Sequence, residues 1–195
     1  MHQIIAGIAT VENRIHSFFH NHNFGQLLRQ SNIRKEKGIC LDTLFQFLLS
    51  LASTGKNLFR LLESVESPTG ISKDTAYRLL NSVTANWRRF LLLLSTRVIV
   101  QRLLPLTDEA TTKVLIADDT LYSRGRSKRV ELLARVRDHN TGRYVRGFRM
   151  LTLGWSDGNS FVPMMLSMLS SAKEENRLAT MRDGIDKRTS GYKRR

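Results

Sequence analysis

The hydrophobic pattern of the chain changes character between residues 105 and 112, and this change limits the folds open to it. Up to Leu104, apolar residues recur at helical spacing, as in Leu41–Leu51 and Leu58–Val65. A last long helix is predicted from about Thr84 to Leu104, with Pro105 expected to stop it. The pattern predicts an all-helical N-terminal domain over residues 1–105.

Beyond residue 112 the pattern is typical of an α/β domain, predicted over residues 112–195. Lys113–Ala117 (KVLIA) is a short continuous run of β-favouring residues and predicts a buried central strand. Two further strands are predicted at Arg146–Trp155 and Ser160–Met168, joined by a hairpin turn that contains Asp-Gly. A polar tail follows, and its acids are expected on a solvated helix face: Glu174, Glu175, Asp183 and Asp186.

Composition indicates a globular protein of the cell interior. Hydrophobic residues make up 41% and charged residues 25% of the 195 positions, which are ordinary globular values. Cys40 is the single cysteine, which excludes an internal disulfide framework and a multi-thiolate zinc site. No apolar stretch reaches the roughly 20 residues of a membrane span, and the N-terminus lacks the features of a signal peptide. A cytoplasmic location without a membrane partner is therefore expected.

Positive charge points to a polyanionic partner. The chain holds 31 Lys and Arg residues against 17 Asp and Glu, a formal net charge of +14. The basic residues are densest in Tyr122–Arg149, where nine cations face two acids. Nucleic acid is the abundant polyanion inside a cell, so DNA binding is favoured. An acidic protein partner or an anionic lipid surface is the alternative that charge alone leaves open.

One helical segment has the outline of a helix-turn-helix. A loop with Pro68 and Gly70 precedes Ser72, a plausible N-cap for the helix that carries Lys73, Tyr77 and Arg78. These three side chains are the candidates for contacts with a specific DNA site. Two packed helices of an ordinary bundle would have the same outline.

Two adjacent carboxylates follow the first predicted strand. Asp118 and Asp119 point to opposite faces if the strand continues through them, so one of them can face a cleft. A carboxylate fixed in this way is a good ligand for Mg²⁺. Two-metal phosphoryl transfer on nucleic acid needs several such carboxylates in one place. The alternative is that Asp118-Asp119-Thr120 is a turn that closes the strand.

The segment VLIADDTLYSRGRSKRVELLARVRDHNTGRYVRGFRMLTLGWSDGNSFVPM resembles the start of the catalytic domain of bacterial insertion-sequence transposases. These are cut-and-paste DDE enzymes with a ribonuclease-H-like fold. The resemblance assigns the first catalytic and metal-binding Asp to Asp119, before Thr120, with Asp118 as the alternative. It also implies that the N-terminal half is the DNA-binding region, with ISKDTAYRLL in the place of the helix-turn-helix.

The resemblance also implies partners and a cofactor. The intact enzyme would use two Mg²⁺ ions, act on double-stranded DNA at terminal repeats and target sites, and associate with the bacterial nucleoid, and it could form a homodimer. Phosphate contacts would come from Arg124, Arg126, Lys128 and Arg129.

One departure from the family shapes the functional expectation. The second Asp and the Y-x2-R-x3-E signature are not found, so the chain is expected to be an inactive N-terminal fragment with an incomplete ribonuclease-H-like domain. The competing hypotheses are a non-catalytic DNA-binding regulator or transposition inhibitor, and an RNA-binding accessory protein.

Overall fold

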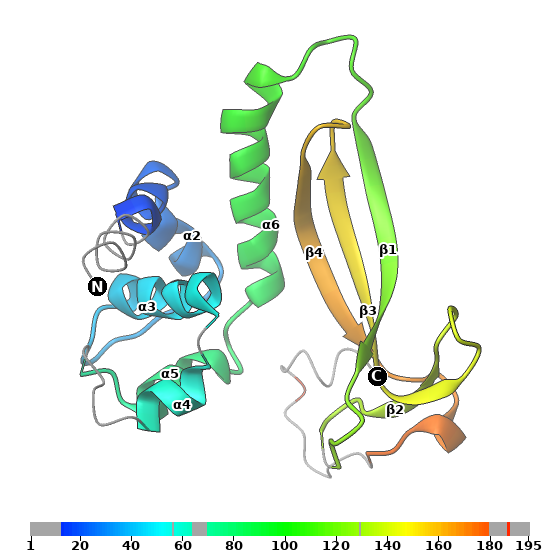
Figure 1. The fold of residues 1–195 in the computed structure, drawn as a ribbon. Coiled ribbons are helices and arrows are strands. Elements are labelled where there is room, and N and C mark those ends of the chain that lie inside the picture. The colour runs from blue at the N-terminus through cyan, green and yellow to red at the C-terminus, as the bar shows by residue number, and fades with distance from the viewer. Residues whose placement is uncertain (1–12, 56, 64–69, 129, 180–186, 188–195) are drawn as a thin grey trace, which may run out of the picture. The chain divides into compact units, whose positions relative to one another are not determined.

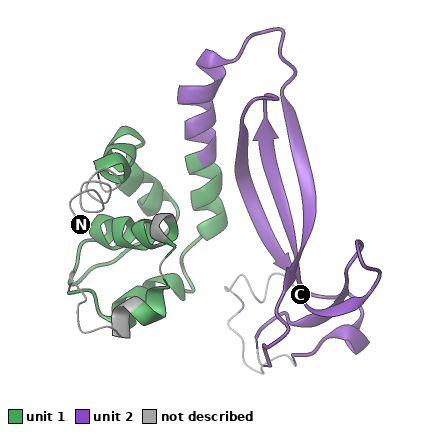
Figure 2. Cartoon of the chain, viewed as in Figure 1, with its two compact units in different colours: residues 1–94 green, residues 95–195 purple. Residues whose placement is uncertain are grey.

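The computed structural model describes residues 13–55, 57–63, 70–128, 130–179 and 187. The chain divides into two compact units, residues 1–94 and residues 95–195, here called unit 1 and unit 2 (Figure 2). Together they form a mixed α+β protein, as expected, with helices and an antiparallel sheet (Figure 1). The expected functional division, a DNA-binding domain over 1–105 and a catalytic domain over 112–195, stays a prediction.

The described part of unit 1 consists of helices and their connections. Residues 13–21 are helical. The labelled helices that follow are α2 (Phe24–Gln30), α3 (Leu41–Thr54), α4 (Leu58–Glu63) and α5 (Lys73–Leu80). Helix α3 confirms the predicted helix over Leu41–Leu51 and extends it to a left-handed C-cap at Gly55. The predicted cap of α5 is also confirmed, because the Ser72 side chain accepts a hydrogen bond from the backbone N–H of Thr75.

Aromatic side chains build the core of unit 1. Phe24 stacks on Phe19 with 3.8 Å between ring centroids and meets Phe90 edge-on at 5.0 Å. Leu28 and Leu44 are fully buried in the same cluster. The helices of unit 1 therefore pack around one apolar core.

The long predicted helix ends earlier than expected. Helix α6 runs over Trp87–Val98, and a π-helical segment, Ile99–Leu103, and a 3-10 turn, Leu104–Leu106, follow it. Pro105 lies at the start of that 3-10 turn, where a backbone N–H has no hydrogen-bond acceptor within the turn, so the N–H that proline lacks is not needed. The α-helical hydrogen bonding is already replaced at Ile99, so Pro105 does not mark the end of the α-helix.

Strand β3 (Tyr144–Ser156) is the centre of the sheet in unit 2. Strand β1 (Val114–Ser123) pairs with it antiparallel over its whole length. Strand β4 (Phe161–Leu169) pairs antiparallel with residues 149–156 of β3, which also pair with β1. Strands β1 and β4 therefore lie on opposite edges of β3. Strand β2 (Ala134–Arg137) pairs with the opposite end of β3. In Figure 1, β1, β3 and β4 run side by side as three long strands.

Strand β1 differs from the prediction in two ways. It was expected to be a buried central strand that ends at Ala117, but within the described residues it pairs only with β3 and forms an edge. It also continues through Asp118, Asp119 and Thr120 to Ser123. Leu115 is 65% exposed. Nothing described covers β1, so its apolar run does not create a buried position.

The predicted hairpin is confirmed. Residues 157–160 join β3 to β4, and Gly158 has φ +86°, which favours glycine. Asp157 shapes the turn: its Oδ1 accepts the backbone N–H groups of Asn159 and Ser160, and its Oδ2 accepts the hydroxyl of Thr107 at 2.8 Å. These bonds, that from Ser160 first, lower the pKa of Asp157.

The helix predicted in the polar tail does not form in the part of the tail that the structure describes. Glu174–Asn176 forms a single 3-10 turn. Arg177 then forms an isolated antiparallel β-bridge with Ala134, the first residue of β2. Glu174 and Glu175 are exposed. Asp183 and Asp186 lie outside the described residues. Over the described ranges, no helix has both the length and the apolar character of a membrane span.

Candidate functional site: two carboxylates on an edge strand

Strand β1 separates its two aspartates. Asp118 pairs in register with Thr152 and Asp119 with Leu151 of β3. Because neighbouring residues of a strand alternate between faces, the two carboxylates point away from each other. Both lie inside the strand, so the expectation of a strand end and the alternative of a closing turn are both wrong. Their exposure comes from the open edge and uncovered faces of β1.

Asp118 is held by a neighbour on its own strand. The Thr120 hydroxyl donates a hydrogen bond to Asp118 Oδ2 at 2.6 Å. Residues two apart on a strand share a face, which brings the two side chains together. One carboxylate oxygen of Asp118 is thereby occupied.

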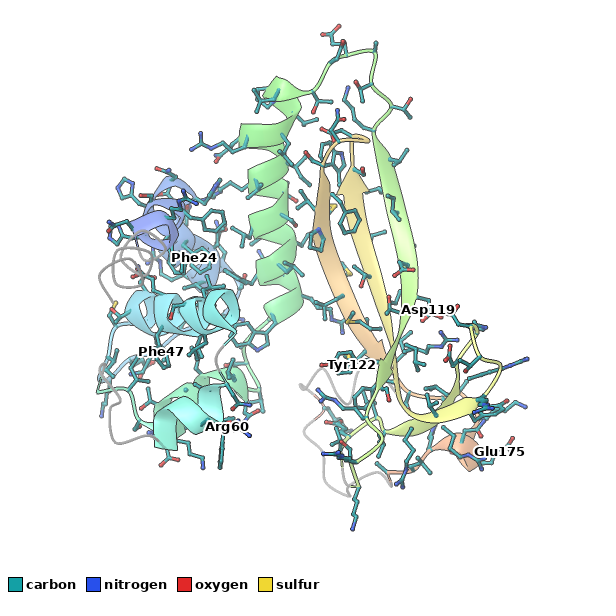
Figure 3. The ribbon with its side chains drawn as sticks, viewed as in Figure 1. Phe24, Phe47, Arg60, Asp119, Tyr122 and Glu175 are labelled. Carbon is teal, nitrogen blue, oxygen red and sulfur yellow. The ribbon has the colours of Figure 1, made fainter. Side chains whose placement is uncertain are left out.

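Asp119, labelled on β1 in Figure 3, forms an ion pair with a cation from the adjacent strand. Nη1 of Arg149 lies 3.5 Å from Asp119 Oδ2, and the two side chains are 17% and 49% exposed, respectively. Arg149 pairs with Leu121, two residues beyond Asp119, so the ion pair is a diagonal contact on one face of the sheet. Arg149 also donates to Nε2 of His139 in the loop between β2 and β3. Asp119 remains half open to solvent.

The loop that carries His139 is tightly ordered. Asp138 accepts the Asn140 backbone N–H and the Thr141 hydroxyl, both within 2.9 Å. These bonds, that from Thr141 first, lower the pKa of Asp138. A further backbone bond closes the loop from Gly142 N–H to the Asp138 carbonyl. The partner of Arg149 therefore comes from a well-defined turn.

Three of the four arginines in the described strands lie on the Asp118 face: Arg135, Arg137 and Arg146. Every second residue of β3 shares this face, from Thr152 opposite Asp118 down to Arg146, whose partner on β2 is Arg135. Tyr122 also belongs to it, and the guanidinium of Arg124 stacks 4.5 Å from the Tyr122 ring centroid. Arg149 is the cation that the register places on the Asp119 face.

The other predicted phosphate contacts lie beyond β1. Arg126 and Lys128 are exposed in the connection from β1 to β2, and neither forms a hydrogen bond or ion pair with another described residue. Arg129 lies outside the described residues. The structure thus brings Arg124 next to β1 and leaves Arg126 and Lys128 in an open segment.

The candidate DNA contacts of α5 have different surroundings. The Lys73 ammonium lies 4.1 Å from the ring centroid of Phe59 on α4. Tyr77 is half-buried, whereas Arg78 is exposed and donates from Nε to the Asp74 carbonyl. The turn between α4 and α5 includes residues outside the described ranges, so the helix-turn-helix stays a prediction.

The described residues alone do not fit a two-magnesium centre. No three His, Cys, Asp or Glu side chains in the described ranges come together in a group that could hold a metal ion. Asp118 and Asp119 diverge, Asp157 is used by its turn, and Glu174 pairs with Arg177. Each face of β1 therefore offers a single carboxylate, while two-metal chemistry needs several.

Sequence reasoning missed the direct partner of Asp119. Arg149 was counted only as one cation of a basic segment, and His139 was not singled out. The contact between Asp119 and Arg149 depends on the β1–β3 register. No hairpin turn joins these two strands directly, so the local sequence does not fix that register. Strand β2 was missed as well, although Ala134–Arg137 alternates small apolar residues with arginines, the pattern of a half-buried strand.

Comparison with known proteins identifies the family. A family profile described as DDE superfamily endonuclease matches residues 23–193. The chain belongs to the DDE endonuclease superfamily. No curated protein and no solved structure gave a match. Membership in a DDE endonuclease family indicates phosphodiester cleavage on DNA, and nucleases of this superfamily typically use divalent metal ions.

Proposed function

We propose that this DDE endonuclease acts in DNA-mediated transposition of an insertion sequence, and that Asp119 is one of its catalytic carboxylates. The observation that carries the proposal is Asp119 itself, a half-exposed carboxylate on an edge strand, with Arg149 as its counter-ion. It lies within the segment matched to the DDE endonuclease family. Asp118 is the alternative, although Thr120 already occupies one of its oxygens.

The sheet supports a ribonuclease-H-like domain. Strands β1, β3 and β4 form an antiparallel set, with the aspartates on the first strand and the Asp157-Gly158 turn joining the other two. The resemblance to insertion-sequence transposases implies a ribonuclease-H-like fold, and this antiparallel set supports it, although the aspartates lie inside β1 and do not follow it. Carboxylates from outside the described residues would complete the Mg²⁺ site, and a homodimer is one source of them.

Basic side chains would hold the DNA on the Asp118 face of β1, and this placement is the observation that favours the alternative carboxylate, Asp118. Arg124 presents its guanidinium over Tyr122, and Arg126 and Lys128 are exposed in the connection that follows β1. With Arg129 they are proposed to bind phosphates of double-stranded DNA, which positions the duplex without reading its sequence. Lys73, Tyr77 and Arg78 are proposed for contacts at the terminal repeats. A DNA-bound protein of this kind would reside with the bacterial nucleoid in the cytoplasm.

A non-catalytic DNA-binding regulator or transposition inhibitor is the second candidate function. The divergence of Asp118 and Asp119 favours it, because the described residues gather no acidic cluster. A regulator needs the basic surface but not Asp119. The two candidates therefore differ only in strand cleavage: cleavage that is lost in Asp119→Ala would identify the enzyme.

A gel-shift and nicking experiment tests the proposal. We expect the purified chain to bind duplex DNA in preference to single-stranded RNA, and Asp119→Ala to bind as well as wild type. With six phosphate contacts, log K would fall against log salt with a slope near −5. We expect no nicking of supercoiled plasmid in Mg²⁺ or Mn²⁺ by the chain alone, and Asp119-dependent nicking would show that it is a complete enzyme. Failure to bind duplex DNA would refute the proposal.

A further inference from the structure

A second basic surface lies in unit 1. A cavity of about 450 Å³ opens between the loop after α2 and helix α5. Four cations line it: Arg34, Lys35, Lys37 and Arg78. Thr75 and Ser82 add two hydroxyl groups, and Gly38, Ile39 and Leu79 complete the lining. None of these nine described lining residues carries a carboxylate.

The loop that carries three of the cations is fixed at both ends. Ile33 is fully buried and donates its backbone N–H to the Leu28 carbonyl at 2.9 Å. Ile39 packs against the apolar core of unit 1. Gly38 has φ +80°, which allows the chain to turn back toward the core. Residues 34–38 are therefore presented by anchored positions on either side.

Among the described residues, the four cations of this cavity have no carboxylate partner. Across the described ranges, none of the four forms an ion pair with a carboxylate. Lys35 donates to the Lys37 carbonyl, and Arg78 uses its Nε for the Asp74 carbonyl, which leaves its terminal nitrogens available. Four neighbouring like charges repel one another, and an anion that binds between them removes this cost.

We infer that this cavity, here called the loop–α5 site, binds phosphates of the DNA backbone. Arginine forks and lysine ammonium groups suit phosphate oxygens, and the two hydroxyls add donors. Recognition of single-stranded RNA would favour aromatic stacking surfaces, and none of the lining residues is aromatic. Insertion into a lipid surface would favour exposed apolar side chains, but Leu79 is buried and Ile39 half-buried.

The loop–α5 site changes the role of α5. The inference rests on the proposed DNA-binding function and assigns unit 1 a backbone contact of its own. Arg78 belongs to this site, whereas Lys73 packs over Phe59. Arg34, Lys35 and Lys37 join it from a loop that sequence reasoning did not single out. Backbone contacts of this kind fix the register of a protein on a duplex.

A salt titration of DNA binding tests the site in the full chain. Arg34→Gln with Lys37→Gln should weaken duplex binding by roughly tenfold or more and reduce the salt slope by about two. Arg14→Gln with Lys113→Gln removes the same charge from exposed positions outside the cavity and should have a much smaller effect. Thermal unfolding of both variants should match wild type.

The outcomes separate this inference from the proposed function. If wild type binds DNA but the Arg34/Lys37 variant keeps its affinity and salt slope, the loop–α5 site is refuted while the proposed function stands. A variant that loses binding only to single-stranded RNA or to phosphatidylserine vesicles also refutes it. If wild type binds no duplex DNA, the proposed function fails as well.

Discussion

Asp118 and Asp119 are neighbours in the chain, but they have different surroundings. Thr120 bonds to Asp118 at 2.6 Å, while Asp119 faces the Arg149 guanidinium at 3.5 Å. In this arrangement Arg149 supplies the positive charge that a metal ion would otherwise bring to Asp119. A guanidinium and a divalent cation therefore compete for the same carboxylate.

Removing this competitor should strengthen metal binding. We expect Arg149→Gln to bind Mn²⁺ several-fold more tightly than wild type, because the cation beside Asp119 is lost. Water-proton relaxation during a Mn²⁺ titration measures this affinity. Arg143→Gln is the control, since it removes an exposed arginine with no ion pair to Asp119. Unchanged affinity in Arg149→Gln would show that the ion pair does not limit access to Asp119.

Gly147 sets how closely β1 approaches β3 at Tyr122 and Ser123, near the C-terminal end of β1. A Cβ at this position would lie 2.3 Å from the Tyr122 carbonyl oxygen. Because that atom belongs to the backbone, Gly147→Ala must push the two strands apart, at a cost of about 1–3 kcal/mol in unfolding free energy. Urea unfolding measures the loss. Gly125→Ala, where a Cβ meets nothing within 4 Å, should leave stability nearly unchanged, and an equal effect of both substitutions would contradict this account.

Two features of single residues could be predicted from the local sequence. Alternation along a strand is a local rule, and it predicted that Asp118 and Asp119 would face opposite ways. The turn role of Asp157 also followed from local sequence, because the Asp-Gly pair defines it. The contact of Asp119 with Arg149 joins residues 30 positions apart and needs the strand register, so it could not be predicted.

The hairpin formed by β3 and β4 is an element whose turn is specified by the local sequence. Its turn depends on one carboxylate, Asp157, which three donors hold and which ties the hairpin to Thr107. The apolar run of β1 shows the opposite case. Its residues favour a strand, but burial depends on what covers the strand, and a continuous apolar run does not specify a cover.

The pH dependence of unfolding tests the hairpin. The pKa of Asp157 is lower in the folded state than its ordinary value of 3.8. Its stabilisation is therefore complete above about pH 3.8 and is lost as the pH falls below that value through the folded pKa. Asp157→Asn should lower the melting temperature at neutral pH and flatten its fall below pH 3.8. The exposed control Glu109→Gln should reproduce the wild-type profile, and an unaltered profile in Asp157→Asn would contradict this role.

For the whole molecule, the net charge of +14 includes a basic surface in each of the two units. One follows β1, with Arg124 over Tyr122, and the other is the loop–α5 site of unit 1. Composition predicts the polyanionic partner, but it does not show which cations lack acidic partners. The loop of residues 34–38 became a candidate only when its anchors and the position of α5 were known.

Paramagnetic broadening by Mn²⁺ tests most directly whether Asp119 is a metal-binding carboxylate of a DDE endonuclease. This NMR measurement detects weak binding, which is what a single carboxylate provides. We expect Mn²⁺ to broaden backbone amide signals around Asp119, Asp119→Asn to abolish the effect, and Asp118→Asn to retain it. Broadening that survives in Asp119→Asn and disappears in Asp118→Asn, or that never reaches β1, would contradict the account.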